Sequence, residues 1–180
     1  STAGNADSKP YAFEIGKKVI KDHVKRSLGV DVEVEDGLTP GSYSVKYKVN
    51  GNPKVSIIVD ANDIKEKENV EKLLNKIKDT TYENYEIILI TTEKNIDGVN
   101  KIIEPKENIY ETYNEAVEKA EGKYFIIFDK NLIEINNKSY IEDLIGIAQD
   151  KNVAIVGTKL YNKNKKVEHC GIVLGMNGAG

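Results

Sequence analysis

An apolar run of five residues, Val55–Val59, leads directly into the polar stretch Asp60–Asp63 and then into a helical pattern. Such a run is typical of a strand that is buried on both faces of a parallel sheet. A second apolar run, Tyr124–Phe128, ends in the same way at the polar stretch Asp129–Asn131. The carboxyl ends of parallel strands meet at the ligand edge of an open α/β sheet. The two runs therefore predict that their polar ends share one site.

Strand and helix patterns alternate through the rest of the chain from residue 52. Besides the two runs above, strands are predicted at Tyr85–Ile90, Ile102–Ile103, Val153–Val156 and around Val167 and Ile172–Leu174. Helices are predicted at Ile64–Asp79, at Ile109–Glu121, which Gly122 would end, and around Ile141–Ala148. This order predicts an α/β fold with an open, mostly parallel sheet, helices on both faces and right-handed crossovers.

The residues before position 52 show a different pattern. Residues 1–10 are small and polar and are expected to be a flexible terminus. Within 11–51, an amphipathic helix is expected at Phe13–Leu28, followed by two alternating strands at 30–35 and 43–49 that pair as a hairpin. We interpret 11–51 as an extension, either a solvated ribbon or a docking surface, and 52–180 as the main domain.

Composition limits the classes of protein that this chain can belong to. With 180 residues, 39% hydrophobic content and a formal charge of −3, it matches one soluble domain with a core. Its basic residues are spread among acidic ones, so nucleic acid is not expected as a partner. No apolar run reaches the roughly 20 residues of a transmembrane segment, and Cys170 is the single cysteine. A reducing, cytoplasmic location is expected.

Several segments in order resemble family 2 glycosyltransferases of the GT-A fold. They are Pro53–Asp63, Thr80–Ile88, Tyr113–Ala116 with Ala120–Tyr124, and Val156–Tyr161 with His169–Gly175. The stretch from Ile20 to Tyr47 is similar to the segment that precedes the transferase domain in bacterial members that build polysaccharides or glycans. The resemblance covers nearly the whole chain after residue 10 and implies a Rossmann-like half that binds a nucleotide sugar.

The resemblance also implies an activity and its partners. It implies transfer of a sugar from a nucleotide-diphosphate donor to a glycan or polysaccharide acceptor, with inversion, in the cytoplasm or at the cytoplasmic face of the membrane. A divalent metal, Mg²⁺ or Mn²⁺, would sit on the diphosphate. The donor-binding candidates are Asp60, Asp63, Thr91, Thr92, Asn114, Asp129 and Asn131, and the metal candidates are Asp129 and Asn131.

The sequence departs from the family pattern at three places. The carboxylate that ends the family's second strand corresponds here to Thr91-Thr92, and hydroxyls accept hydrogen bonds more weakly than a charged oxygen. The metal motif is Asp129-Lys130-Asn131, where the lysine disfavours a cation unless its ammonium replaces the metal. No catalytic base can be named, and we expect the acceptor half to belong to further domains of a larger protein.

Two other interpretations stay open at this stage. A degenerate, non-catalytic relative would serve as a binding or protein-interaction module. A phosphoacceptor receiver domain could present Asp60, Asp63 and Asp129 with Lys159 as its lysine, although its spacing fits less well. Single residues have plainer explanations too, because Asp63 could cap the helix that follows it and Asn114 could lie on a helix surface.

Overall fold

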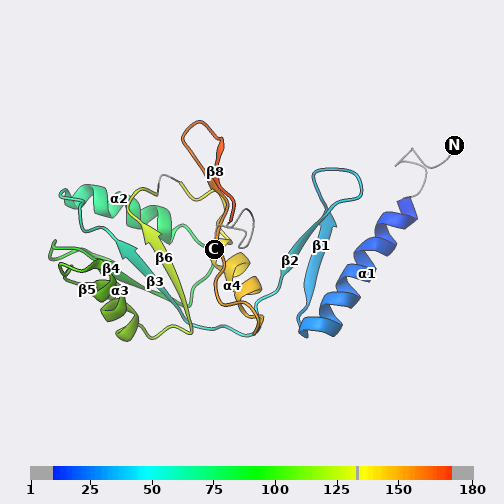
Figure 1. Cartoon of the computed structure of the whole chain (residues 1–180), viewed down its shortest axis with the longest axis horizontal. Coiled ribbons are helices and arrows are strands. Elements are labelled where there is room, and N and C mark those ends of the chain that lie inside the picture. Colours follow the sequence, from blue (N-terminus) through cyan, green and yellow to red (C-terminus); the bar gives the residue numbers. More distant parts are fainter. Residues whose placement is uncertain (1–9, 133, 172–180) are drawn as a thin grey trace, which may run out of the picture.

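The computed structural model describes residues 10–132 and 134–171 (Figure 1). The strands are β1 (Val32–Asp36), β2 (Tyr43–Tyr47), β3 (Val55–Asp60), β4 (Tyr85–Ile90), β5 (Lys101–Ile103), β6 (Tyr124–Asp129), β7 (Leu160–Tyr161) and β8 (Val167–His169). The helices are α1 (Pro10–Leu28), α2 (Lys67–Lys78), α3 (Ile109–Glu118) and α4 (Tyr140–Ala148).

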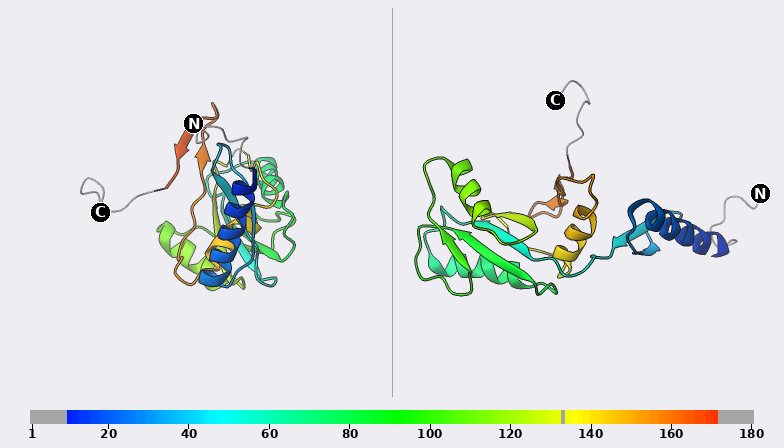
Figure 2. Two further views of the ribbon diagram at one scale, coloured as in Figure 1. Left: turned by 90° about the vertical axis from the view of Figure 1, so that its right-hand side faces the viewer. Right: turned by 90° about the horizontal axis from the view of Figure 1, so that it is seen from below.

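Four strands form one sheet in the order β5-β4-β3-β6, and every neighbouring pair is parallel. Helices α2 and α4 contribute to the core on one face, and α3 contributes to the core on the other. Figures 1 and 2 show the sheet between these helices. The predicted α/β class, with a parallel sheet flanked by helices, is therefore confirmed.

The two faces of the sheet are sealed by aliphatic side chains that alternate along the central strands. Ile57 and Leu89 face α2 and α4, whereas Ile58 and Ile88 face α3, and all four side chains are inaccessible to solvent. Burying each such side chain contributes roughly 1.5–3 kcal/mol relative to leaving it exposed. The apolar runs of β3 and β4 are continuous because both of their faces are covered, whereas β6 leaves one face open, with Phe125 46% and Ile127 57% exposed.

The N-terminal segment forms its own small core. Strands β1 and β2 pair antiparallel as the expected hairpin, with Glu33 opposite Lys46. One face of this hairpin packs on α1, where Val24, Val32 and Val34 are each at most 7% exposed. The helix predicted from Phe13 begins earlier, at Pro10. The surface that this amphipathic helix needs is thus the hairpin itself.

The hairpin reaches the main sheet through α4. The side-chain amide of Gln149 donates to the carbonyl of Lys48 at 2.7 Å, and its oxygen accepts the N–H of Asn50 at 2.9 Å. Gly146 lies so close to the Tyr47 carbonyl that a Cβ there would overlap it. The missing side chain of Gly146 therefore lets α4 approach β2.

A Gly146→Ala substitution tests this junction. Helix propensity alone predicts that alanine stabilises α4 by about 1 kcal/mol. We expect the opposite result, a loss of about 1–3 kcal/mol in the free energy of unfolding, because the new methyl group overlaps the Tyr47 carbonyl. Trypsin should also cut faster at Lys48 and Lys54. Gly157→Ala, where a Cβ meets nothing within 4 Å, is the control. A variant as stable and as resistant as wild type would contradict this view of the junction.

The prediction of a strand at Val153–Val156 is wrong, because this segment pairs with no strand in the structure. Helix α4 covers the same face as α2, which connects β3 to β4. A right-handed crossover on that face would return the chain to the position that β3 already fills. The segment therefore does not extend the parallel sheet, and Ile155 is 88% exposed.

Other predicted boundaries also shift. Helix α2 begins at Lys67 with Glu66 as its N-cap, so Asp63 does not cap it. Helix α3 ends at Glu118, three residues before the expected end, and Gly122 serves close packing rather than a helix cap. Its N–H donates to the Ser56 hydroxyl at 2.8 Å, and a Cβ there would overlap the Ser56 backbone. The predictions for 1–9 and for Ile172–Leu174 lie outside the described residues.

A buried carboxylate anchors the end of α3 to the sheet. Glu86 on β4 is 1% exposed, and its Oε1 accepts hydrogen bonds from the Ser56 hydroxyl and the Glu121 N–H, both at 2.6 Å. Its Oε2 lies 3.0 Å from the Lys101 ammonium, which also contacts Glu121 at 2.8 Å and the Lys119 carbonyl at 2.7 Å. Burial by itself raises the pKa of Glu86, but these hydrogen bonds and Lys101 hold it below its ordinary value.

Candidate functional site

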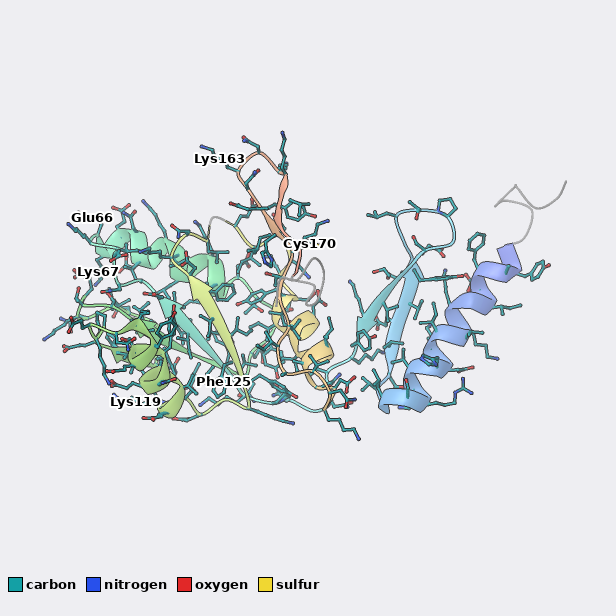
Figure 3. The ribbon with its side chains drawn as sticks, viewed as in Figure 1. Glu66, Lys67, Lys119, Phe125, Lys163 and Cys170 are labelled. Atoms are coloured by element: carbon teal, nitrogen blue, oxygen red, sulfur yellow. The ribbon has the colours of Figure 1, made fainter. Side chains whose placement is uncertain are left out.

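Two aspartates meet at the carboxyl edge of the sheet (Figure 3 shows the ribbon with its side chains). Asp60 ends β3 and Asp129 ends β6, and the two residues are Cα partners in the parallel register. Counted in chain order within this sheet, the strands run 3-2-1-4, so the order reverses between β3 and β6. Ligands of open α/β sheets bind at such a switch point, outside the carboxyl ends of the strands. The two predicted polar ends are thus brought together at the switch point of this sheet.

Asp60 is held from both sides. The Tyr113 hydroxyl of α3 donates to Oδ2 at 3.1 Å, and the Asn62 N–H donates to Oδ1 at 3.1 Å. Burial of the phenol, together with the negative charge of Asp60 and then Asp129, raises the pKa of Tyr113 to about 12. Tyr113 therefore remains a neutral donor across the physiological range, and it fixes the carboxylate that it contacts.

A Tyr113→Phe substitution measures this contact. We expect a loss of about 1–2 kcal/mol in the free energy of unfolding, because the partly buried Asp60 carboxylate loses a hydrogen bond to a charged group. Denaturant unfolding measures the change. Tyr110→Phe is the matched control, since Tyr110 is 75% exposed on the same helix. If the two variants lie within about 0.5 kcal/mol of each other, the contact does not hold Asp60 in solution.

The residues after β6 form a tight polar turn. The N–H of Asn131 donates to Asp129 Oδ1 at 2.7 Å, and the Lys130 ammonium pairs with Asp63. The Asp63 carboxylate raises the pKa of Lys130, and Asp60 and Asp129 raise it further. We call Asp60, Asp63 and Asp129 the carboxylate edge. The Lys130 ammonium thus pairs with the loop carboxylate of this edge, and the two strand-end carboxylates add to the negative charge that acts on it.

The predicted metal motif of this edge contains a lysine between its two oxygen-bearing residues. Within residues 10–132 and 134–171, no group of three or more histidine, cysteine or acidic side chains is arranged to hold an ion. Asn131 contacts Asp129 through its backbone N–H, and the Lys130 ammonium is paired with Asp63. The metal role predicted for Asp129 and Asn131 therefore stays a prediction, with an opposing charge beside it.

The other predicted donor residues differ in their placement. Thr91 follows β4 but is 1% exposed, and its hydroxyl accepts the Glu93 N–H at 3.1 Å, so it shapes the loop. Thr92 beside it is exposed. Asn114 is exposed on α3 and, among the described residues, makes no side-chain hydrogen bond. The sequence pattern indicated Asn114, whereas its neighbour Tyr113 is the α3 residue that reaches the edge.

The receiver-domain interpretation is not supported by the topology. Receiver-like flavodoxin folds order their strands 2-1-3-4-5, whereas this sheet runs 3-2-1-4. Lys159, the proposed receiver lysine, lies with its ammonium over the ring of Tyr161, 5.1 Å from the centroid. The order 3-2-1-4 is the beginning of the classical dinucleotide-binding arrangement.

Two curated proteins are similar to this chain over nearly its whole length. The uncharacterized protein y4gI of Sinorhizobium fredii is 27% identical over 195 residues, covering 99% of this chain and 21% of that protein. The O-antigen biosynthesis protein RfbC of Myxococcus xanthus is 30% identical over 182 residues, covering 93% of this chain and 14% of that protein. The chain therefore spans about a fifth or less of these relatives. No family model matches it.

A comparison with solved structures gives a weaker likeness. The mannosyltransferase PcManGT from Pyrobaculum calidifontis, in complex with GDP-Man and Mn²⁺, superposes with a TM-score of 0.46 at 17% identity. The match covers 82% of this chain and 44% of that one. A superposition at this level does not define a function.

None of the described helices is long and apolar enough to cross a membrane.

Proposed function

We propose that residues 52–180 are the donor-binding domain of a family 2 glycosyltransferase of the GT-A type. The domain would bind a nucleotide-diphosphate sugar for transfer, with inversion, to a glycan or polysaccharide acceptor. The observation that carries the proposal is the position of Asp60 and Asp129, side by side at the switch point of a parallel sheet with strand order 3-2-1-4. Similarity to a protein named for O-antigen biosynthesis supports the glycan class.

The chemistry of the edge suits the separate parts of such a donor. Sugar and ribose rings present hydroxyl groups, and carboxylates are strong acceptors for them. In this proposal Asp60 and Asp129 accept hydrogen bonds from donor hydroxyls, while the Lys130 ammonium leaves Asp63 to meet the diphosphate. The exposed Thr92 and Asp63 lie in the loops that follow β4 and β3, where they can border the donor.

Transfer itself needs groups beyond those described. Because the chain spans 14–21% of its relatives, we assign it donor binding and leave the catalytic base and acceptor site to the rest of a larger protein. Residues 11–51 would be an extension that α4 fastens to the binding domain. We place this domain in the cytoplasm or at the cytoplasmic face of a membrane, where a cytoplasmic nucleotide sugar can reach it.

A second candidate function is a non-catalytic binding module. It is favoured by two local features: Thr91 is buried and engaged with the Glu93 N–H, and a lysine stands inside the predicted metal motif. A module of this kind would keep the fold but would no longer bind a nucleotide-sugar donor. The two functions differ in whether a nucleotide diphosphate perturbs the edge.

Chemical-shift mapping separates these functions. When UDP, GDP or ADP is added to ¹⁵N-labelled protein, we expect the largest amide shifts at 60–63, 91–93 and 129–131. Inorganic phosphate at equal concentration is the control for a general response to an anion. Shifts that are spread over α1 and the β1–β2 hairpin, or no shifts with any nucleotide, would favour the interaction module.

A further inference from the structure

We infer that the Lys130 ammonium is the built-in counter-ion of the carboxylate edge and excludes a divalent metal from it. This role involves only the chain's own residues and does not require a nucleotide. It follows from the contacts of Lys130, from the oxygen atoms left available and from the charge that a metal would meet.

Lys130 is held among acidic groups that come from separate elements. Its ammonium pairs with Asp63 in the loop after β3, and its side chain is 31% exposed, against 70% for Asp63. Asp60 and Asp129 are Cα partners at the ends of β3 and β6; Asp129 directly precedes Lys130 in the chain, and Asp60 comes three residues before Asp63. The ammonium of Lys130 is thus paired with one of the three carboxylates of the edge.

The oxygen atoms of the edge are largely engaged. Both oxygens of Asp60 accept hydrogen bonds, one from Tyr113 and one from the Asn62 N–H. One oxygen of Asp129 accepts the Asn131 N–H. Mg²⁺ and Mn²⁺ favour close to six oxygen ligands, and Mg²⁺ demands near-ideal octahedral geometry. Each of these oxygens keeps a second lone pair, so the contacts hold the carboxylates in place, and the lysine is the group that a metal would have to displace from Asp63.

Charge acts in the same direction. A divalent ion about 4 Å from an ammonium loses roughly thirtyfold in affinity, even at the dielectric constant of water. Replacing the lysine by a neutral side chain removes this repulsion and leaves the three carboxylates of the edge without its positive charge. The structure therefore predicts that Lys130→Gln gains a divalent-metal site that the natural chain lacks.

Titration with Mn²⁺ alone tests the inference. We expect no saturable binding to the natural chain below about 1 mM, and an affinity at least about tenfold higher in Lys130→Gln. The gained binding should disappear in the double variant Lys130→Gln/Asp129→Asn. Lys65→Gln is the charge-matched control, because Lys65 is exposed in the loop between β3 and α2. Thermal unfolding verifies that each variant is folded.

Paramagnetic broadening locates any bound Mn²⁺. In Lys130→Gln the broadened amides should be those of 60–63 and 129–131. The inference is overturned if the natural chain binds Mn²⁺ tightly and Asp129→Asn abolishes that binding. It is equally overturned if Lys130→Gln binds no better than Lys65→Gln. Neither result depends on donor binding, so the proposed function is tested separately.

Discussion

Glu86→Ala is expected to lower the free energy of unfolding by about 3–5 kcal/mol, a larger loss than Gly146→Ala or Tyr113→Phe should cause. The substitution removes a carboxylate that is 1% exposed and that accepts bonds from Ser56, Lys101 and the Glu121 N–H. Each donor then faces a site that water reaches poorly, and an unsatisfied buried group costs about 1–3 kcal/mol. The end of α3 would lose its attachment to β4.

Two variants make this result interpretable. Glu86→Gln keeps the shape and part of the hydrogen bonding, so its loss should be smaller. Glu83→Ala removes an exposed carboxylate just before the same strand and should stay within about 0.5 kcal/mol of wild type. Urea unfolding at pH 7 gives the three values. If Glu86→Ala and Glu83→Ala were equally stable, the buried network would have no net role.

The pH dependence provides a second readout of the same network. The folded pKa of Glu86 lies below its ordinary value of 4.5, and Lys101 and Lys54 lower the pKa of Glu121 to about 2. A lowered folded pKa means stability that is present above about pH 4.5 and is lost as the pH falls toward the folded pKa. The difference between wild type and Glu86→Ala should therefore shrink as the pH falls from about 5 to about 3. A constant difference would contradict an ionised Glu86.

Asp129→Ala is expected to weaken nucleotide-sugar binding by at least about tenfold while leaving the fold intact. Asp129 is exposed at the end of β6, so its removal costs little stability. A bound donor would lose a charged acceptor for its hydroxyls, and sites built for hydroxyl groups discriminate strongly through such contacts. Calorimetry with the nucleotide sugar measures the loss.

The choice of ligand and control makes the Asp129 experiment specific. Inorganic diphosphate lacks hydroxyl-bearing rings, so the substitution should not weaken its binding. Asp22→Ala changes the net charge equally, and Asp22 is exposed on α1, the helix that packs on the β1–β2 hairpin. Unchanged affinity in a folded Asp129→Ala variant would remove Asp129 from the donor site.

Most of the sheet could be predicted because its signals are local. Apolar runs flanked by turn residues identified β3, β4 and β6, and apolar residues three and four positions apart identified α2 and α4. Val153–Val156 has the same composition but forms no strand, since crossover handedness and the position of α4 decide its place. Such constraints involve elements that are distant in sequence, and a local pattern does not contain them.

The site was predictable in its strand ends but not in its contacts. Asp60 and Asp129 could be paired because parallel strands end at one edge. Tyr113 fitted a helix pattern, and only the packing of α3 on the sheet shows that its hydroxyl reaches Asp60. Glu86 appeared as one polar residue in a strand, and its network draws on residues from Lys54 to Glu121.

Calorimetric titration of the natural chain with UDP, GDP and ADP, in EDTA and again in Mn²⁺, tests the central claim most directly. We predict saturable one-to-one binding of at least one nucleotide diphosphate, already present in EDTA. Binding that appears only with Mn²⁺ would keep the donor site and overturn the role given to Lys130. Absence of binding to every nucleotide under both conditions would contradict a donor-binding function for this domain.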